Sequence, residues 1–121
     1  MKRAIVTGGA GFIGSHMVDL LLSKNFKVIV VDDLSGGHTK NIKQHFKNRN
    51  FSLKKKNILT IKPDDKIFNK VDYVFHFAGI GDIVPSIEKP TTYMQVNVQG
   101  TVNILEASRF HNVKKLVYAA S

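Results

Sequence analysis

Short apolar runs alternate along the chain with longer segments whose apolar residues recur at helical spacing. Residues 4–6, 28–31 and 71–77 form apolar runs rich in β-branched and aromatic residues, which is typical of buried parallel strands. Between the first two runs, residues 12–23 place their apolar side chains on one broad stripe, which predicts an amphipathic helix packed on a sheet. The stripe consists of Phe12, Ile13, Met17, Leu20, Leu21 and Leu22, and it leaves His16, Asp19 and Lys24 for solvent.

The same alternation continues along the rest of the sequence. Residues 51–55 alternate between apolar and polar, which predicts a third strand near a sheet edge, and residues 115–120 predict a fifth. We expect short helices at residues 41–47 and just before Lys70, and the longest helix at residues 92–110. That helix has its apolar positions at Val96, Val98, Val102, Ile104, Leu105 and Ala107. Strands that alternate with helices predict one α/β domain over residues 1–121, a doubly wound parallel sheet in the order 3-2-1-4-5.

Three glycines stand at three-residue spacing where the first strand ends and the first helix begins. Gly8, Gly11 and Gly14 suit a backbone that must turn sharply, approach a ligand and pack closely on the sheet. The positive dipole end of the helix would face this loop, where a pyrophosphate is the natural occupant. A turn needs glycine whether or not it binds anything. The prediction of a dinucleotide site therefore depends on Asp32 and Asp33, which begin 18 residues after Gly14 at the end of the second apolar run.

Asp32 has the position of the acid that binds a nucleotide ribose in such folds. A carboxylate there accepts hydrogen bonds from both ribose hydroxyls and repels a 2′-phosphate, so the sequence favours NAD over NADP. Asp33 either assists it or only caps the turn, and Ser35 and Gly36 either touch the adenosine side or form a plain turn. The loops at the carboxyl ends of the predicted strands thus converge beside the glycines.

Composition narrows the classes of protein further. The 121 residues suffice for one domain with a buried core. The sequence contains no run of 18 apolar residues, so no membrane span is expected. The first strand follows Met1 almost at once and leaves no room for a signal peptide, so we expect a cytoplasmic protein without a membrane partner. The absence of cysteine excludes disulfides and thiolate chemistry and suits a reducing compartment. The five histidines lack metal-ligand spacing, so no metal is expected.

The net charge of +9 is unevenly distributed. Ten of the eighteen lysines and arginines lie between Gly36 and Lys70, where Asp64 and Asp65 are the only acids. This segment contains no helix-turn-helix, zinc or RNA-binding signature, so nucleic-acid binding is a hypothesis that rests on charge alone. A solvated basic flank that helps to attract a phosphorylated ligand explains the charge better.

Four motifs together resemble the extended short-chain dehydrogenase/reductase family. They are Thr-Gly-Gly-Ala-Gly-Phe-Ile-Gly-Ser-His at residues 7–16, Val-Asp-Asp-Leu at 31–34, His-Phe-Ala-Gly at 76–79 and Asn-Val-Gln-Gly-Thr at 97–101. Within that family the chain is most similar to the N-terminal NAD-binding part of UDP-glucose 4-epimerase and of related nucleotide-sugar epimerases and dehydratases. The resemblance implies a Rossmann-like fold and a tightly held NAD, which takes a hydride from sugar C4 and returns it to the other face.

The resemblance also implies roles for individual residues. The pyrophosphate would be lined by Gly8, Gly11, Phe12 and Ile13, and the ribose by Asp32. Where the family commonly has Asp-Ile against adenine, this sequence has Asn57 and Ile58. The segment that would pass beneath the pyrophosphate and the nicotinamide ribose consists of Phe77, Ala78 and Gly79. Asn97 resembles the family's structural asparagine behind the catalytic strands, although an ordinary exposed helix residue is the alternative. Ser121 resembles the active-site serine or threonine that hydrogen-bonds the reacting sugar oxygen.

The general base of this family has no counterpart among the tyrosines. The family uses a tyrosine with a lysine four positions later, but Phe77 and Asn97 follow Tyr73 and Tyr93 at that distance, and the sequence ends too soon after Tyr118. We therefore expect a chain truncated before the catalytic helix, which binds NAD without turnover, takes a nucleotide sugar only with the missing C-terminal part, and forms homo-oligomers through uncovered surface. A dehydratase fragment and a standalone NAD- or partner-binding module remain alternatives, ahead of a nucleic-acid-binding protein.

Overall fold

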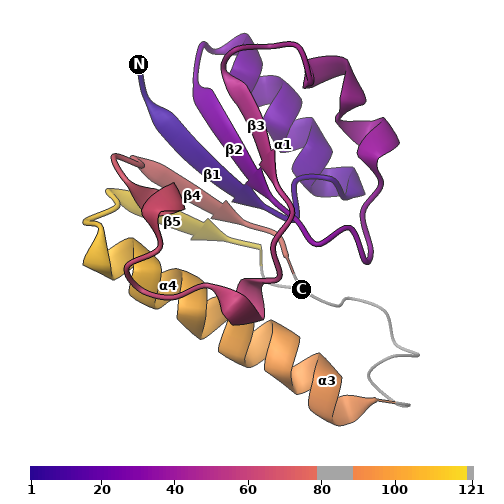
Figure 1. Ribbon diagram of the computed structural model, residues 1–121, viewed down its shortest axis with the longest axis vertical. Helices are drawn as coiled ribbons and strands as arrows, with labels where there is room; N and C mark the ends of the chain where they lie inside the picture. Colours follow the sequence, from indigo (N-terminus) through magenta and orange to yellow (C-terminus); the bar gives the residue numbers. More distant parts are fainter. Residues whose placement is uncertain (79–88, 120–121) are drawn as a thin grey trace.

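The described residues form five parallel strands in one sheet, with helices on both faces (Figure 1). This computed structural model describes residues 1–78 and 89–119. The strands are β1 (Arg3–Thr7), β2 (Lys27–Val31), β3 (Phe51–Lys54), β4 (Tyr73–His76) and β5 (Lys115–Tyr118), and they lie in the order β3-β2-β1-β4-β5. The predicted Rossmann-like fold class and strand order are confirmed.

β1 lies at the centre of the sheet and pairs with both β2 and β4. The pairing with β2 begins at Arg3 opposite Lys27, and the pairing with β4 begins at Ala4 opposite Tyr73. Because every pairing is parallel, the carboxyl ends of the strands meet at one edge. The chain winds outward from β1 to β3 and then returns to β4 on the other side of β1. A parallel sheet has its ligand crevice at such a switch point.

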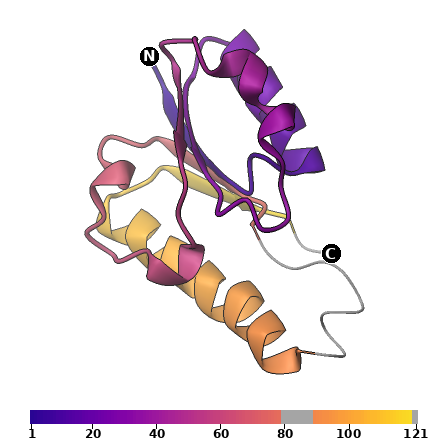
Figure 2. The ribbon, with the colours of Figure 1, turned by 45° about the vertical axis from the view of Figure 1, so that its right-hand side comes forward.

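Helix α1 (Phe12–Ser23) covers one face of the sheet, and a longer helical stretch covers the other (Figures 1 and 2). The longer stretch consists of α3 (Pro90–Met94), a π-helical turn at Gln95–Gln99, called the π turn below, and α4 (Gly100–Phe110). Four short 3₁₀ turns lie at Thr39–Asn41, Lys43–His45, Ile58–Thr60 and Lys66–Phe68. The polypeptide therefore has the three-layer arrangement that buries both faces of a parallel sheet.

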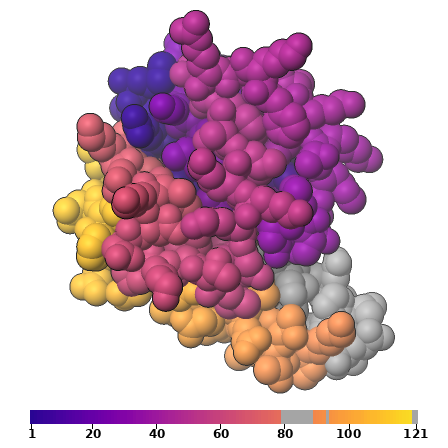
Figure 3. Space-filling model, in the orientation of Figure 1, coloured from indigo at the N-terminus to yellow at the C-terminus, as the bar shows by residue number. Residues whose placement is uncertain are grey.

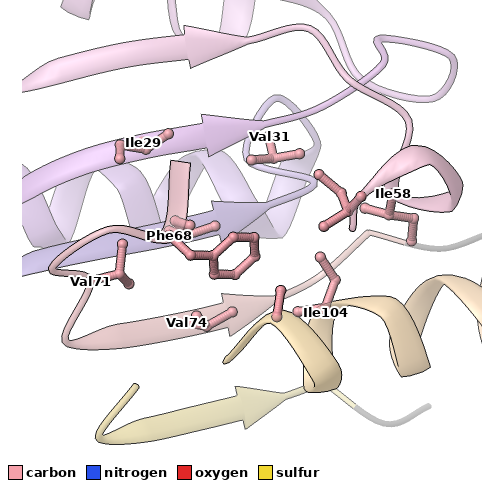
Figure 4. Packing of buried hydrophobic residues seen from close by; sticks show 10 residues of the cluster. Ile29, Val31, Ile58, Phe68, Val71, Val74 and Ile104 are labelled. Carbon is pink, nitrogen blue, oxygen red and sulfur yellow. The ribbon is translucent and has the colours of Figure 1, made fainter. Parts of the chain in front are cut away.

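The sheet separates two hydrophobic clusters because side chains alternate between its faces along each strand. On the α4 face, Ile5, Ile29, Val31 and Val74 from the strands pack with Phe68 and Ile104 (Figure 4). On the α1 face, Ala4, Val6, Val28 and Val30 pack with Val18, Leu21 and Ile42. Burying one such large side chain contributes roughly 1.5–3 kcal/mol. Together the clusters hold β1, β2 and β4 in place, and these strands position the site.

The predicted apolar stripe of α1 is wrong in part. The helix has the predicted bounds, but Phe12, Ile13 and Leu20 are exposed, and its buried positions are Gly14, Ser15, Val18 and Leu21. The first turn packs so closely on the loop after β1 that only small residues fit beneath it. The larger apolar side chains beside them consequently face outward.

Two other helix predictions also need correction. Residues 41–47 do not form a helix, because two separate 3₁₀ turns there place Ile42 in the core between them. The long helix has three parts, and its buried residues are Gly100, Ile104, Ala107 and Ser108, whereas Val98, Val102 and Leu105 are exposed. A helix that rests on a sheet through small residues leaves part of its apolar surface to solvent.

Candidate functional site

A cavity of about 410 Å³ opens at the carboxyl edge of the sheet. Its walls come from the loops that follow β1, β2, β3 and β4 and from the start of the α3 and π-turn stretch. Ten residues predicted to bind the cofactor line it: Gly8, Gly11, Asp32, Asp33, Ser35, Gly36, Asn57, Ile58, Phe77 and Ala78. Sequence reasoning missed five more, which are Val31, Gly37, Lys56, Thr92 and Val96. The switch point of the sheet thus carries a hollow to which four loops contribute.

The loop after β1 turns sharply at Gly8. This residue has a φ of 69°, in the left-handed region, and its N–H donates to the Val31 carbonyl over 2.8 Å. A Cβ at Gly8 would lie 2.8 Å from the Ala78 nitrogen, so no other residue fits without displacing the backbone after β4. Gly8 therefore brings the ends of β1, β2 and β4 together at the cavity floor.

Gly11 and Gly14 complete the junction between β1 and α1. Gly11 is the N-cap of α1 without a side-chain cap, and its own N–H donates to the Gly8 carbonyl over 3.0 Å. A Cβ at Gly14 would collide with the Gly8 carbonyl. The first N–H groups of a helix have no partner within it, and here they stand beside the cavity with the positive dipole end. This arrangement suits a phosphate group.

Asp32 provides a fixed carboxylate at the opposite wall. It is 8% exposed, its Oδ2 accepts from the Ala10 N–H over 3.0 Å, and its Oδ1 accepts from the Leu34 N–H over 2.7 Å. Each carboxylate oxygen has a further lone pair, so these bonds orient the group and leave it able to accept more. Two neighbouring ribose hydroxyls are suitable donors.

Asp33 and Ser35 organise the loop after β2. One oxygen of Asp33 accepts from both the N–H and the hydroxyl of Ser35, over 3.0 and 2.7 Å. This is the turn-capping role that the sequence left open for Asp33, although both residues also line the cavity. A Cβ at Gly36 would meet no atom within 4 Å, so this part of the wall is open.

The segment after β3 forms the third wall. The Asn57 side chain accepts from the Leu59 N–H over 2.9 Å and caps the 3₁₀ turn at Ile58–Thr60. Its neighbour Lys56 donates to Asp65 over 2.8 Å. Partial burial raises the pKa of Asp65, but the hydrogen bonds from Lys56 and from the Ile67 N–H outweigh it and hold the pKa below its usual value. Lys56 could not be predicted to line the cavity, because nothing in the sequence distinguishes it from the other lysines of the basic segment.

That basic segment covers much of one side of the molecule. Figure 3 shows residues of the middle of the chain, in magenta and pink, over most of the face turned to the viewer. Lys56 from this segment also lines the cavity. Because Lys56 is paired with Asp65 over 2.8 Å, the net positive charge of the segment as a whole, rather than Lys56 itself, would attract anionic ligands.

His76 at the end of β4 is buried behind the cavity and belongs to a chain of hydrogen bonds. Its Nδ1 lies 2.6 Å from Thr7 Oγ1, its Nε2 lies 3.0 Å from Thr101 Oγ1, and Tyr118 stacks on its ring. Burial lowers the pKa of His76 to about 4, so the imidazole is neutral at physiological pH. In the sequence this histidine appears only as the first residue of the His-Phe-Ala-Gly motif at residues 76–79.

The directions of these bonds follow from counting donors and acceptors. Thr7 Oγ1 accepts from the Ala78 N–H over 3.1 Å and shares the Phe77 N–H, which lies 3.1 Å away and also donates to the Thr7 carbonyl over 3.0 Å. We assign the Thr7 proton to Nδ1 of His76, so that the neutral ring carries its own proton on Nε2 and donates it to Thr101. Thr101 in turn donates to the Asn97 carbonyl over 2.8 Å.

Three further predicted site residues, Phe12, Ile13 and Asn97, are described by the structure but do not line the cavity. Phe12 and Ile13 have exposed side chains, so only their main-chain N–H groups stand at the start of α1. Asn97 is half-buried in the π turn, and its carbonyl accepts from Thr101. Gly79 and Ser121 lie outside the described residues.

Residues 1–78 and 89–119 contain no group of three or more histidine, cysteine, aspartate or glutamate side chains that could hold a metal ion. Within the same ranges, each helix is too short or too polar to cross a membrane.

The fold and the geometry of the loops define a Rossmann-like α/β protein of the nucleotide-binding type. The glycine turn at a helix N-terminus, the buried acid after β2 and the cavity between them have the shape and the hydrogen-bonding groups that suit a dinucleotide. Comparison with known proteins then gives the family. Residues 4–121 match the model of the NAD dependent epimerase/dehydratase family, and the chain belongs to that family, whose cofactor is NAD.

Individual relatives agree with this assignment. A putative UDP-glucose 4-epimerase of Methanocaldococcus jannaschii is 41% identical over 118 residues, which cover 97% of this chain and 37% of the relative. The solved UDP-N-acetylglucosamine 4-epimerase from Methanobrevibacter ruminantium M1 is 34% identical with a TM-score of 0.91, over 99% of this chain and 38% of that one. UDP-glucose 4-epimerase from Thermus thermophilus, solved in complex with NAD, is 33% identical with a TM-score of 0.84, over 98% and 37%. The chain spans between 18% and 38% of the length of the curated relatives.

Proposed function

We propose that the cavity binds NAD and that the chain is the N-terminal, cofactor-binding part of a nucleotide-sugar 4-epimerase. The observation that carries the proposal is the Asp32 carboxylate, which is buried at the end of β2 and held by two main-chain N–H groups at the wall of the cavity. An acid in this position accepts from both ribose hydroxyls and repels the phosphate of NADP. The 4-epimerase relatives support the choice of reaction.

In this proposal each wall of the cavity contacts a different part of NAD. The N–H groups of Phe12 and Ile13 at the start of α1 bind the pyrophosphate, which approaches the backbone at Gly11. Asn57 and Ile58 contact the adenine, and the backbone at Phe77 and Ala78 passes under the nicotinamide half. NAD held in this way would supply reversible hydride transfer at sugar C4. The residues of this chain hold and orient the cofactor.

Residues 1–121 contain the cofactor-binding part of the site but lack the catalytic tyrosine–lysine pair of the family. Phe77 and Asn97 stand four positions after Tyr73 and Tyr93, so residues 1–121 do not contain the complete tyrosine–lysine pair that takes the proton of the C4 hydroxyl in this family. We therefore infer that residues 1–121 bind NAD without epimerising a nucleotide sugar, and that sugar binding needs further polypeptide.

We also propose a cytoplasmic location for the protein and self-association of the chain. Cell fractionation tests the first.

Calorimetric titration of the 121-residue chain with NAD and with NADP tests the proposal directly. We expect NAD to bind at least tenfold more tightly, which corresponds to about 1.4 kcal/mol, because Asp32 faces the 2′ position. Asp32→Asn should remove most of this preference. Asp19→Asn, on the exposed part of α1, is the matched control and should keep it. Equal affinities of the unaltered chain for the two nucleotides would refute the role of Asp32, and no binding of either would refute the proposed function.

A further inference from the structure

The hydrogen bonds around His76 connect two walls of the cavity through side chains that do not line it. The main chain at Phe77 and Ala78 belongs to one wall, and Val96 in the π turn belongs to the other. Thr7, His76 and Thr101 stand behind these walls, and we call them the Thr-His-Thr relay. The relay begins at the N–H groups after β4 and ends at the carbonyl of Asn97, next to Val96.

We propose that His76 is a positioning residue for the dinucleotide site, and that the Thr-His-Thr relay fixes the separation between the exit of β4 and the π turn. The inference rests on the proposed function, because the effect it describes is on NAD affinity. Nothing in the relay touches the cofactor in this proposal. It acts through the backbone at Ala78, which packs directly against Gly8 on the cavity floor.

The relay is suited to this role because all of its groups have partners. Thr7 is fully buried and His76 is 1% exposed, so water cannot replace a lost partner at either residue. A buried network in which every donor and acceptor has a partner makes the elements that it joins more rigid. If one member loses its partner, the free energy of unfolding decreases because a buried polar group is left without a hydrogen bond. The elements joined here are β1, β4 and the π turn, which are distant in sequence and adjacent at the cavity.

The π turn is the part of the wall most dependent on such a link. π-helical turns are rare, and this one interrupts a helix where it meets the cavity. The Thr101 hydroxyl donates to the carbonyl of Asn97 within this irregular stretch. Loss of the hydroxyl therefore frees the π turn and leaves the Nε2 proton of His76 unmatched at the same time.

Substitutions at Thr101 separate positioning from general stability. Thr101→Val keeps the shape and removes the hydroxyl, whereas Thr101→Ser keeps the hydroxyl, and position 101 does not line the cavity. We expect Thr101→Val to raise the Kd for NAD at least fivefold, measured well below its melting temperature. Thr101→Ser should stay within twofold of the unaltered chain. Val113→Ala, between α4 and β5 and partly buried against the cluster on the α4 face, serves as the control that lowers the melting temperature without moving the Kd.

Two results of the NAD titrations would overturn the positioning role of His76. If the unaltered chain binds NAD and Thr101→Val changes the Kd no more than Val113→Ala does, the positioning role is overturned and the proposed function stands. If the unaltered chain does not bind NAD, both are overturned. Nitrogen-15 NMR of the unaltered chain adds a test that needs no variant. A proton on Nε2 of His76 supports the relay, and a proton on Nδ1 contradicts it.

Discussion

Asp32 and His76 are two buried polar residues at the same edge of the sheet, and the protein matches each with the opposite kind of partner. Asp32 only accepts, and it receives main-chain N–H groups from Ala10 and Leu34. His76 accepts at one nitrogen and donates at the other, and it lies between two hydroxyls. The first arrangement leaves lone pairs for a ligand, while the second uses every hydrogen-bonding atom of the ring.

The neutral state of His76 should make the protein sensitive to mild acid. Its pKa falls from 6.5 to about 4 on folding, so the unfolded chain binds the proton more readily between these values. The free energy of unfolding is then highest above pH 6.5 and decreases as the pH falls toward 4, by up to roughly 1.4 kcal/mol per pH unit. Urea unfolding between pH 7 and 4.5 measures this dependence. His76→Asn should flatten it, and parallel curves for the two proteins would contradict the assignment.

Sequence reasoning reached Asp32 because its signal is local: an acid directly after an apolar strand, at a set distance from a glycine turn. His76 gave no such signal, because its partner Thr7 is 69 residues away and Thr101 is 25 residues away. Lys56 was missed for a different reason, since neighbouring lysines have the same local pattern. Residues whose role depends on one distant contact cannot be found from local pattern alone.

At the scale of elements, the loop between β1 and α1 dictates which side of the helix is buried. The Gly14 backbone approaches the Gly8 carbonyl so closely that the helix rests on its small residues. The sequence predicted the bounds of α1 and the strand order, because hydrophobic period and glycine position determine both. It did not predict which apolar residues face the core, since Phe12, Ile13 and Val18 are equally apolar and only the packing distance distinguishes them.

Glycine-to-alanine substitutions test this account of the loop. Gly8→Ala places a Cβ 2.8 Å from the Ala78 nitrogen at a positive φ, so we expect a loss of about 2–4 kcal/mol in the free energy of unfolding. Gly36→Ala meets no atom within 4 Å and should change it by less than about 0.5 kcal/mol. Chemical unfolding monitored by circular dichroism gives both values. Similar losses for the two variants would show that the tight turn is not what requires glycine.

At the scale of the whole molecule, the two helical layers differ in what they expose. Met94, Val98, Val102 and Leu105 are spaced along one side of the α3–α4 stretch and are between 42% and 58% exposed. Apolar side chains gathered in this way are typical of surfaces through which proteins make contacts. The net charge of +9 opposes association in general, so contact through this apolar row should be favoured over nonspecific contact.

We therefore expect the chain to associate reversibly through this row. Analytical ultracentrifugation over a hundredfold range of concentration should show a monomer–oligomer equilibrium. The double variant Val102→Lys with Leu105→Lys should shift it toward monomer at least tenfold. Leu20→Lys introduces a lysine at an exposed apolar position of α1, across the sheet from the row, and should leave the equilibrium unchanged. A protein that remains monomeric throughout would remove the basis for the row as a contact surface.

The parallel arrangement also governs how quickly the sheet can assemble. Each strand pairing in the described sheet crosses a long stretch of chain, from Val28 opposite Phe51 to Ala4 opposite Tyr73. Such pairings have high contact order, because residues far apart in the sequence are in contact. The entropy lost on closing each long loop precedes the stabilising contacts between the strands, which slows folding. β1 can meet β2 comparatively early, but the nucleotide crevice exists only after β4 has arrived on the other side. During synthesis on the ribosome, the glycine turn would therefore emerge long before the strand that completes its binding site.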